Sequence, residues 1–351
     1  MSSCTLDEIL SQPVIWHDTQ RVVIRERATI RRFLDSNQHD ETIFVGCGTS
    51  YYLALAAASM YALVTGQKTK AVPASEVILF ADSVFPNVGN GTMPVLISRS
   101  GTTTEILRAA DTIKQRLGDV TIGISCRSDS ELAQRSTFPL VSPAADEKSI
   151  VMTRSFTSML LLIQYLAAIR ANKRDFEREL AQLPEHGEGV LNKATEMTRQ
   201  IIENGSYSKF VFLGQGPCYG LACEAMLKMK EMSLSVSEAY HSMEYRHGPM
   251  SLVDQDMLLT LIMSERAREQ EKILLKEMKA LGAKTFVICE QSDPEIESAS
   301  DYLMELSSGL SDESRLILPM PALQLLAYYH AVAKGLDPDN PQHLTQVVTL
   351  T

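Results

Sequence analysis

The chain contains two copies of one pattern, and this internal repeat constrains its fold more than any other feature. In the first copy a short β-branched run at residues 42–46 leads through the turn CGTS into a long alanine-rich helical stretch. In the second copy residues 210–214 lead through the turn QGP into another helical stretch. Each copy then has a Ser-Glu pair, a strand, an amphipathic helix, a further strand and an acidic pair before an apolar helix. This shared order predicts two tandem copies of one domain.

Short apolar strands alternate with longer helices in each copy, which is typical of a mostly parallel sheet covered on both sides. Ligands of such sheets bind at the carboxyl ends of the strands, where the strand order switches. We therefore expect an α/β fold of two doubly wound, flavodoxin-like domains. The expected segments are a helical leader over residues 1–40, a first domain over 41–185, and a second domain over 186–351 that includes a C-terminal tail. Residues 172–200, rich in Glu, Lys and Arg, are expected to form a solvated helical link.

Composition and charge narrow the function classes. The 351 residues carry a formal net charge of −10, which argues against non-specific nucleic-acid binding. The most apolar run, residues 158–168, is too short to span a membrane, and the N-terminus lacks the pattern of a secretory signal. The six cysteines include no CxxC pair, so we expect buried reduced thiols, a cytoplasmic location and no metal site.

Two turns in the first copy are candidates for an anion site. Thr49 and Ser50 place hydroxyl groups at the start of a helix, which by itself also fits an ordinary N-cap. The stretch SRSGTTTE at residues 98–105 combines five hydroxyl side chains with a glycine after a strand, and such a loop suits a phosphomonoester. It has no GxxxxGK[ST] pattern, so nucleotide triphosphate binding is not indicated. The equivalent loop of the second copy, residues 263–269, has two glutamates and no glycine and is not expected to bind phosphate.

A third candidate lies in the second copy. Glu224, Lys228 and Glu231 in EAMLKMKE fall on one helix face, a pattern shared by solvated salt-bridge ladders and by functional sites. His247 follows in the turn RHGP, where an imidazole could act as a general acid or base. The residues alone leave both interpretations open.

CGTS, SRSGTTTE, EAMLKMKE and EYRHGP, in this order, resemble the tandem sugar isomerase (SIS) domains of the isomerase half of glucosamine-6-phosphate synthase, over nearly the whole chain. The resemblance implies a homodimer or larger assembly with a shared active site and a phosphosugar substrate. It implies that Glu231 moves a proton between C1 and C2 with Lys228 nearby, and that His247 assists ring opening across a subunit boundary. The residues that it places around the substrate are, for the phosphate, Ser50, Ser98, Arg99 (through its backbone), Ser100 and Thr103, and, for the sugar, Thr49, Ile150, Val151 and Met152.

Two departures from the synthase pattern bear on the reaction. We expect no glutamine-hydrolysing domain before the leader, and Cys4 is not expected to be an N-terminal nucleophile. Gln346 stands where the synthase has a lysine that forms a Schiff base with the sugar, so we do not expect glutamine-dependent synthesis. The chain is then similar to stand-alone SIS enzymes, and residues 146–157 resemble those of the deaminase type.

The leading hypothesis is therefore a deaminase/isomerase of a 6-phosphorylated amino sugar of the glucosamine-6-phosphate type, with no cofactor. The alternatives are a ketose/aldose phosphate isomerase, a deglycase of a glycated-amine 6-phosphate, and a sensor that binds a phosphosugar without turnover. No partner of the nucleic-acid or membrane kind is expected.

Overall fold

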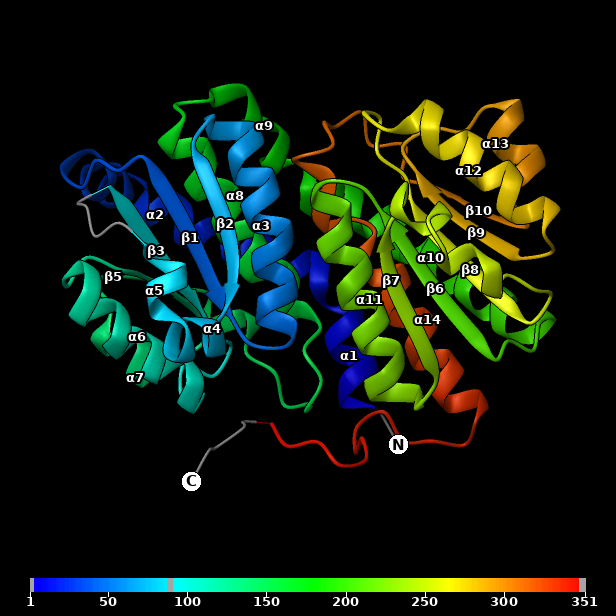
Figure 1. Ribbon diagram of the computed structural model, residues 1–351, viewed down its shortest axis with the longest axis horizontal. Helices are drawn as coiled ribbons and strands as arrows, with labels where there is room; N and C mark the ends of the chain where they lie inside the picture. Colours follow the sequence, from blue (N-terminus) through cyan, green and yellow to red (C-terminus); the bar gives the residue numbers. More distant parts are fainter. Residues whose placement is uncertain (1–2, 87–90, 347–351) are drawn as a thin grey trace. The chain divides into compact units, whose positions relative to one another are not determined.

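The computed structural model describes residues 3–86 and 91–346, which form two compact units, each built around one sheet (Figure 1). The first unit contains residues 11–182 and 345–346, and the second contains residues 3–10 and 183–344. Each sheet has five strands, and all neighbouring strands in it run parallel. This arrangement confirms the predicted fold of two tandem parallel-sheet α/β domains.

The strands of the first unit lie in the order β2-β1-β3-β4-β5. Because β1 lies between β2 and β3, the direction in which the chain adds strands reverses there, and the switch point is between β1 and β3. Val45 pairs with Leu96, so these two strands end side by side. The strands are β1 (Glu41–Gly46), β2 (Lys68–Pro73), β3 (Thr92–Ile97), β4 (Ile122–Ser125) and β5 (Phe138–Val141).

Helices cover both faces of this sheet. Ile43 and Val45 of β1 belong to a core cluster with residues of α4 and α6, whereas Phe44 packs its ring 5.4 Å from that of Tyr61 in α3. Burial on both faces explains why the strand is apolar throughout rather than alternating. The helices of this unit are α2 (Gln12–Ser36), α3 (Thr49–Thr65), α4 (Ala74–Leu79), α5 (Ala81–Val84), α6 (Thr104–Leu117), α7 (Glu131–Arg135), the 3-10 turn η1 (Pro143–Ala145), α8 (Arg154–Arg170) and α9 (Arg174–Ala181).

The second sheet has the same topology, with the order β10-β9-β8-β6-β7 and a switch point between β6 and β8. Val211 and Leu213 of β6 pack in a cluster with residues of α12 and α13, which cover one face. Its strands are β6 (Lys209–Gly214), β7 (Val236–His241), β8 (Met257–Ile262), β9 (Lys284–Cys289) and β10 (Tyr302–Glu305).

The other face of the second sheet is covered by α10, α11 and α14. The helices and 3-10 turns of this unit are α1 (Cys4–Leu10), α10 (Leu183–Asn204), α11 (Pro217–Ser233), η2 (Glu244–Arg246), η3 (Pro249–Leu252), α12 (Arg268–Ala280), α13 (Pro294–Ala299), η4 (Arg315–Ile317) and α14 (Met320–Ala333).

The helical link expected over residues 172–200 is not wholly solvated. Helix α10, which begins in this range and ends at Asn204, has a buried apolar stripe at helical spacing besides its charged residues. The stripe includes Leu183, Val190, Ala194 and Ile201. This stripe packs α10 against α14 within the second unit. The expectation of a solvated link was therefore wrong, because an amphipathic helix can be highly charged on one side and still belong to a core.

One helical stretch, Arg315–Ala333, is long and apolar enough by composition to cross a membrane. Its most apolar window is 78% buried inside the protein, which is typical of a core helix in a folded unit. The cysteines are all described and all free: four are buried, Cys47 is half-buried and Cys4 is exposed.

Candidate active site

The two hydroxyl-rich turns of the first copy both follow strands at the first switch point. The CGTS turn joins β1 to α3, and residues 98–103 join β3 to α6, so both helices begin beside the paired ends of β1 and β3. Gly48 and Gly101 adopt positive φ angles of 53° and 64°, which other residues rarely adopt. A Cβ on Gly101 would lie 2.2 Å from the Ser130 hydroxyl oxygen, so only glycine fits there. The backbone thus brings two helix N-termini to one edge of the sheet, a favourable place for an anion.

The loop of residues 98–104, which we call the hydroxyl loop, partly organises itself. The Ser98 hydroxyl accepts a hydrogen bond from the Gly101 N–H at 3.1 Å and lies 3.2 Å from the Thr103 hydroxyl. The Ser100 hydroxyl accepts from the Thr102 N–H at 3.2 Å. These contacts fix the oxygen positions, and the hydrogen of the Ser100 hydroxyl is left to donate elsewhere.

Several donors around this loop have no acceptor among the described residues. They are the hydroxyl groups of Ser50 and Ser100 and the backbone N–H groups of Ser100 and Thr103. Ser50 and Ser100 are each only 5% exposed, so these two residues do not stand on an open surface. Backbone and hydroxyl donors that converge without a protein acceptor suit a group with several oxygen acceptors, such as a phosphate.

The side chain of Arg99 points away from these donors and into the unit. Its guanidinium donates to the carbonyl oxygens of Ser149, Ile150 and Val151 at 3.0–3.4 Å and pairs with the Glu147 carboxylate at 3.3 Å. It also donates to the Gln346 carbonyl oxygen at 3.2 Å. Arg99 can therefore offer only its backbone to a ligand at the hydroxyl loop, which is the role that the family resemblance implies for it.

The equivalent loop of the second unit, at the β6/β8 switch point, is filled by the protein's own carboxylates. Asp312 accepts hydrogen bonds from the N–H groups of Glu265 and Arg266 at 3.1 and 3.3 Å. Glu271 accepts from the Ser264 N–H at 3.1 Å and from the Ser242 hydroxyl at 2.7 Å. The N–H groups of Ser264, Glu265 and Arg266 that a phosphate would need are thus already paired with carboxyl oxygens of the protein.

Glu271 is fully buried at this second switch point. Burial raises the pKa of its carboxyl group to about 7, although the hydrogen bonds from Ser242 and Ser264 act in the opposite direction. The carboxyl group of Glu271, which reaches the second loop from α12, is therefore expected to titrate near neutral pH.

Three of the four charged residues of α11, Glu224, Lys228 and Glu231, form a largely buried cluster. Lys228 is fully buried and lies 3.3 Å from the Glu224 carboxylate, and it also donates to Glu231, whose side chain is 18% exposed. Burial acts to lower the pKa of Lys228, but the two carboxylates outweigh it and the net pKa is raised. The interpretation as a solvated ladder is thus excluded, and Glu231 is the member of the cluster that reaches the surface of its unit.

His247 ends the 3-10 turn η2, where its N–H donates to the Glu244 carbonyl oxygen at 3.0 Å. Its side chain is exposed and makes no hydrogen bond or ion pair with the part of the chain that the structure describes. The structure shows no hydrogen bond or ion pair between the described side chains of His247 and Glu231. The imidazole is therefore available to solvent or to another molecule.

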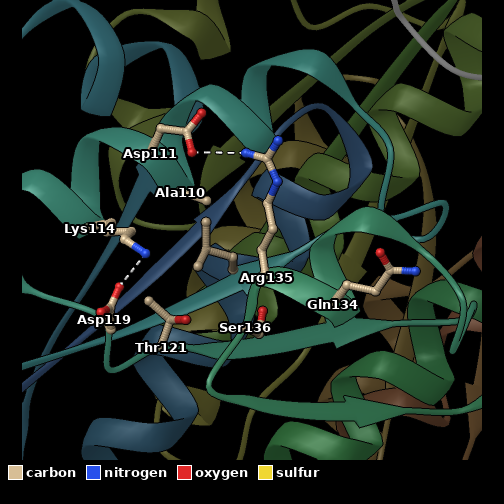
Figure 2. Close-up of a pocket in the computed structure, with 9 residues that line it drawn as sticks. Ala110, Asp111, Lys114, Asp119, Thr121, Gln134, Arg135 and Ser136 are labelled. Carbon is tan, nitrogen blue, oxygen red and sulfur yellow. Dashed lines mark hydrogen bonds and ion pairs between the residues drawn. The ribbon is translucent and has the colours of Figure 1, made fainter.

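A separate hollow of about 450 Å³ lies in the first unit (Figure 2). Its charged lining groups are paired with each other, Arg135 with Asp111 at 2.9 Å and Lys114 with Asp119 at 2.8 Å. It includes Thr121 and Ser136, which precede β4 and β5, so it does not coincide with the hydroxyl loop at the strands' carboxyl ends.

Within residues 3–86 and 91–346 no group of His, Cys, Asp and Glu side chains could hold a metal ion.

The sequence analysis did not predict the contacts of three residues with these loops. Glu147 and Gln346 contact Arg99 from 48 and 247 residues away, and Asp312 reaches the second loop from 47 residues away. Only the acidic pairs at residues 146–147 and 312–313, which mark corresponding places in the two copies, could have pointed to two of them.

Two doubly wound units with polar loops at their switch points define an α/β protein of the class that binds small ligands at the carboxyl ends of its strands. The model of the SIS domain family matches residues 36–169 and 206–329. The chain belongs to this family and contains two SIS domains.

Relatives with described activities are similar over long stretches. A glutamine--fructose-6-phosphate aminotransferase [isomerizing] from Legionella pneumophila (strain Lens) is 32% identical over 312 residues, which cover 87% of this chain and 50% of the relative. The chain thus spans about half the length of the curated relatives it matches, corresponding to the isomerase half of those proteins.

Two solved structures extend this comparison. The glucosamine-6-phosphate deaminase from Thermotoga maritima has a TM-score of 0.76 and 33% identity, covering 95% of this chain and all of that one. The tagatose-6-phosphate ketose/aldose isomerase from Escherichia coli has a TM-score of 0.88 and 22% identity, covering 96% and 95% of the two chains, and shows the shared fold.

Proposed function

We propose that the protein is an enzyme that deaminates and isomerises a 6-phosphorylated amino sugar of the glucosamine-6-phosphate type. The observation that carries the proposal is the difference between the two switch points. Asp312 and Glu271 accept hydrogen bonds from N–H groups of the second loop, whereas the Ser50 and Ser100 hydroxyls and nearby N–H groups of the first have no acceptor in the part of the chain that the structure describes. Buried donors without partners are costly, so their persistence at one of two related sites favours a ligand there.

In this proposal the phosphate of the sugar binds at the hydroxyl loop. Ser98, Ser100 and Thr103 would supply hydroxyl groups, Ser50 would donate from the neighbouring turn, and Arg99 would contribute its backbone. The chain's net charge of −10 gives no general attraction for an anion, so affinity must come from these local donors and from the N-termini of α3 and α6. Thr49 and the backbone of Ile150, Val151 and Met152 would line the sugar.

We assign the proton transfer to Glu231. The carboxylate would remove the proton from C2 of the open-chain aldehyde and return it to C1, which converts the amino aldose into a C2 imine. Water then adds to the imine, and ammonia leaves to give the ketose phosphate. No oxidant or reductant is needed, and the C2 proton ends on C1 or exchanges with solvent.

Lys228 would assist as a fixed cation. Because its pKa is raised, it stays an ammonium that donates to Glu231 and is a poor nucleophile, so a Schiff base through Lys228 is not proposed. Glu224 holds Lys228 from the other side and keeps the buried charge paired.

His247 would open the sugar ring by proton transfer, and in the family resemblance it does so for the site of another subunit. Its exposed side chain, which has no hydrogen-bond or ion-pair partner among the described residues, is consistent with such a role. We therefore also propose that the active form is a homodimer or a larger assembly. The six free cysteines support a cytoplasmic location.

The test is a substrate panel. The protein is incubated with glucosamine 6-phosphate, its unphosphorylated form, aldose and ketose 6-phosphates, and amines glycated with a 6-phosphorylated sugar. Release of ammonia together with ketose phosphate supports the proposal. Interconversion of sugar phosphates without ammonia would identify an isomerase, release of a larger amine a deglycase, and saturable binding without any product a sensor.

A further inference from the structure

The side chain of Arg99 organises a backbone segment that lies far from it in the sequence. Its guanidinium group donates hydrogen bonds to the carbonyl oxygens of three consecutive residues, Ser149, Ile150 and Val151, at 3.2, 3.0 and 3.4 Å. Arg99 is 5% exposed, and a buried guanidinium with five donors in one plane can hold several acceptors at fixed directions. The conformation of residues 149–152 therefore depends on this one side chain.

Because the peptide bond is planar, the directions of these carbonyl groups also fix the directions of the neighbouring N–H groups. In a trans peptide the C=O of one residue and the N–H of the next point in opposite directions. Since the carbonyls of Ser149, Ile150 and Val151 point toward Arg99, the N–H groups of Ile150, Val151 and Met152 point away from it. None of these three N–H groups has an acceptor within residues 3–86 and 91–346. Val151 is buried, whereas Ile150 and Met152 are half-buried, so these backbone donors are free to bind either water or the oxygen atoms of a ligand.

Further contacts hold the segment at both ends. The Glu147 carboxylate, paired with Arg99, accepts from the Thr153 N–H at 2.6 Å and the Ser155 N–H at 3.3 Å, at the start of α8. Gln346 donates its side-chain amide to the Glu147 carbonyl oxygen at 3.1 Å, while its own carbonyl oxygen accepts from Arg99 at 3.2 Å. The segment, the start of α8 and residue 346 of the tail thus share one buried ion pair.

We propose that Arg99 is a positioning residue that aims the N–H groups of Ile150, Val151 and Met152 at oxygen atoms of the sugar, while its own backbone belongs to the phosphate-binding loop. This inference rests on the proposed function. Because an N–H group only donates, these three groups select hydroxyl, carbonyl or enolate oxygens and do not hold the substrate's ammonium group. One residue therefore ties recognition of the phosphate to recognition of the sugar oxygens.

The test separates binding of the phosphate group from binding of the sugar. Dissociation constants for inorganic phosphate and for glucosamine 6-phosphate are measured by calorimetry for the wild type and for Arg99→Lys, whose single ammonium cannot hold four carbonyls and a carboxylate. We expect phosphate affinity to stay within about twofold and sugar-phosphate affinity to fall by about tenfold or more. Arg154→Lys is the matched control, since Arg154 also binds a backbone carbonyl, that of Asp146, but not residues 149–151. It should leave both constants unchanged.

If Arg99→Lys does not fold, the double variant Arg99→Gln with Glu147→Gln removes both buried charges and still leaves Thr153 an acceptor. The same ratio of the two constants is then measured on that variant. An equal loss for both ligands, or no loss for either, would overturn the inference, because a merely structural role moves both constants together. A wild type that binds neither ligand would instead overturn the proposed function, and this inference with it.

Discussion

Replacement of Ser100 by alanine tests the phosphate site with the least disturbance to the fold. The Ser100 hydroxyl accepts from the Thr102 N–H and keeps its own hydrogen for a ligand. Loss of one hydrogen bond to a charged group costs about 1.5–3 kcal/mol. At about 1.4 kcal/mol per factor of ten, phosphosugar affinity should fall by about ten- to a hundredfold. The missing acceptor for Thr102 should cost only about 1 kcal/mol of folding free energy, so the variant stays folded.

The assay is calorimetric titration with a hexose 6-phosphate and with the same hexose lacking the phosphate. Ser264→Ala is the matched control, because the Ser264 hydroxyl likewise accepts an N–H of its own loop, from Ala267 at 3.2 Å, but lies where carboxylates fill the donors. It should leave affinity unchanged. Equal affinity of the wild type for the phosphorylated and unphosphorylated hexose would refute the reasoning, and so would an equal loss in both alanine variants.

Three further predictions concern chemistry, assembly and pH. Glu231→Gln should reduce turnover by about a hundredfold or more with little change in substrate affinity, since the amide keeps the shape and loses the basicity, and near-normal turnover in a steady-state assay would contradict this. Ultracentrifugation at assay concentration should show a dimer or larger species, and a catalytically active monomer would rule out a shared role for His247. The raised pKa of Glu271 means that the unfolded chain loses this proton at lower pH than the folded one, so wild-type stability should fall by about 3 kcal/mol as pH rises from about 4.5 to about 7. Glu271→Gln should flatten that slope in urea unfolding measured across the same range, and an unchanged slope would argue against the shift.

The fold could be predicted because its determinants are local. Runs such as residues 42–46 and 210–214 are apolar on both faces, glycine-containing turns follow them, and the repeat doubles every signal. The two strands expected at residues 42–46 and 210–214 each begin one residue earlier in the structure, as β1 and β6. The mistake over α10 arose because overall charge, rather than the spacing of Leu183, Val190, Ala194 and Ile201, was taken as the guide.

The candidate site was only partly accessible from the sequence. The hydroxyl loop can be recognised in the sequence because its hydroxyl residues lie close together in the chain. The burial of Lys228 cannot, because it depends on packing against residues distant in the sequence. The contacts of Arg99 with Glu147 and Gln346 join distant parts of the chain, and a lone arginine gives no sign of its partners. The residue type at position 99 could be read from the sequence, but the direction of its side chain could not.

The carboxylates at the second switch point have a consequence for competition between ligands. Asp312 is tethered to the same chain as the N–H groups of Glu265 and Arg266, so it meets them at an effective concentration above the millimolar range that even a short flexible tether provides. A free metabolite at millimolar concentration cannot displace it. The anion site of the second domain is thus occupied by a side chain of the protein itself. Although the chain has two related sites, we expect it to bind one molecule of its phosphorylated substrate per chain.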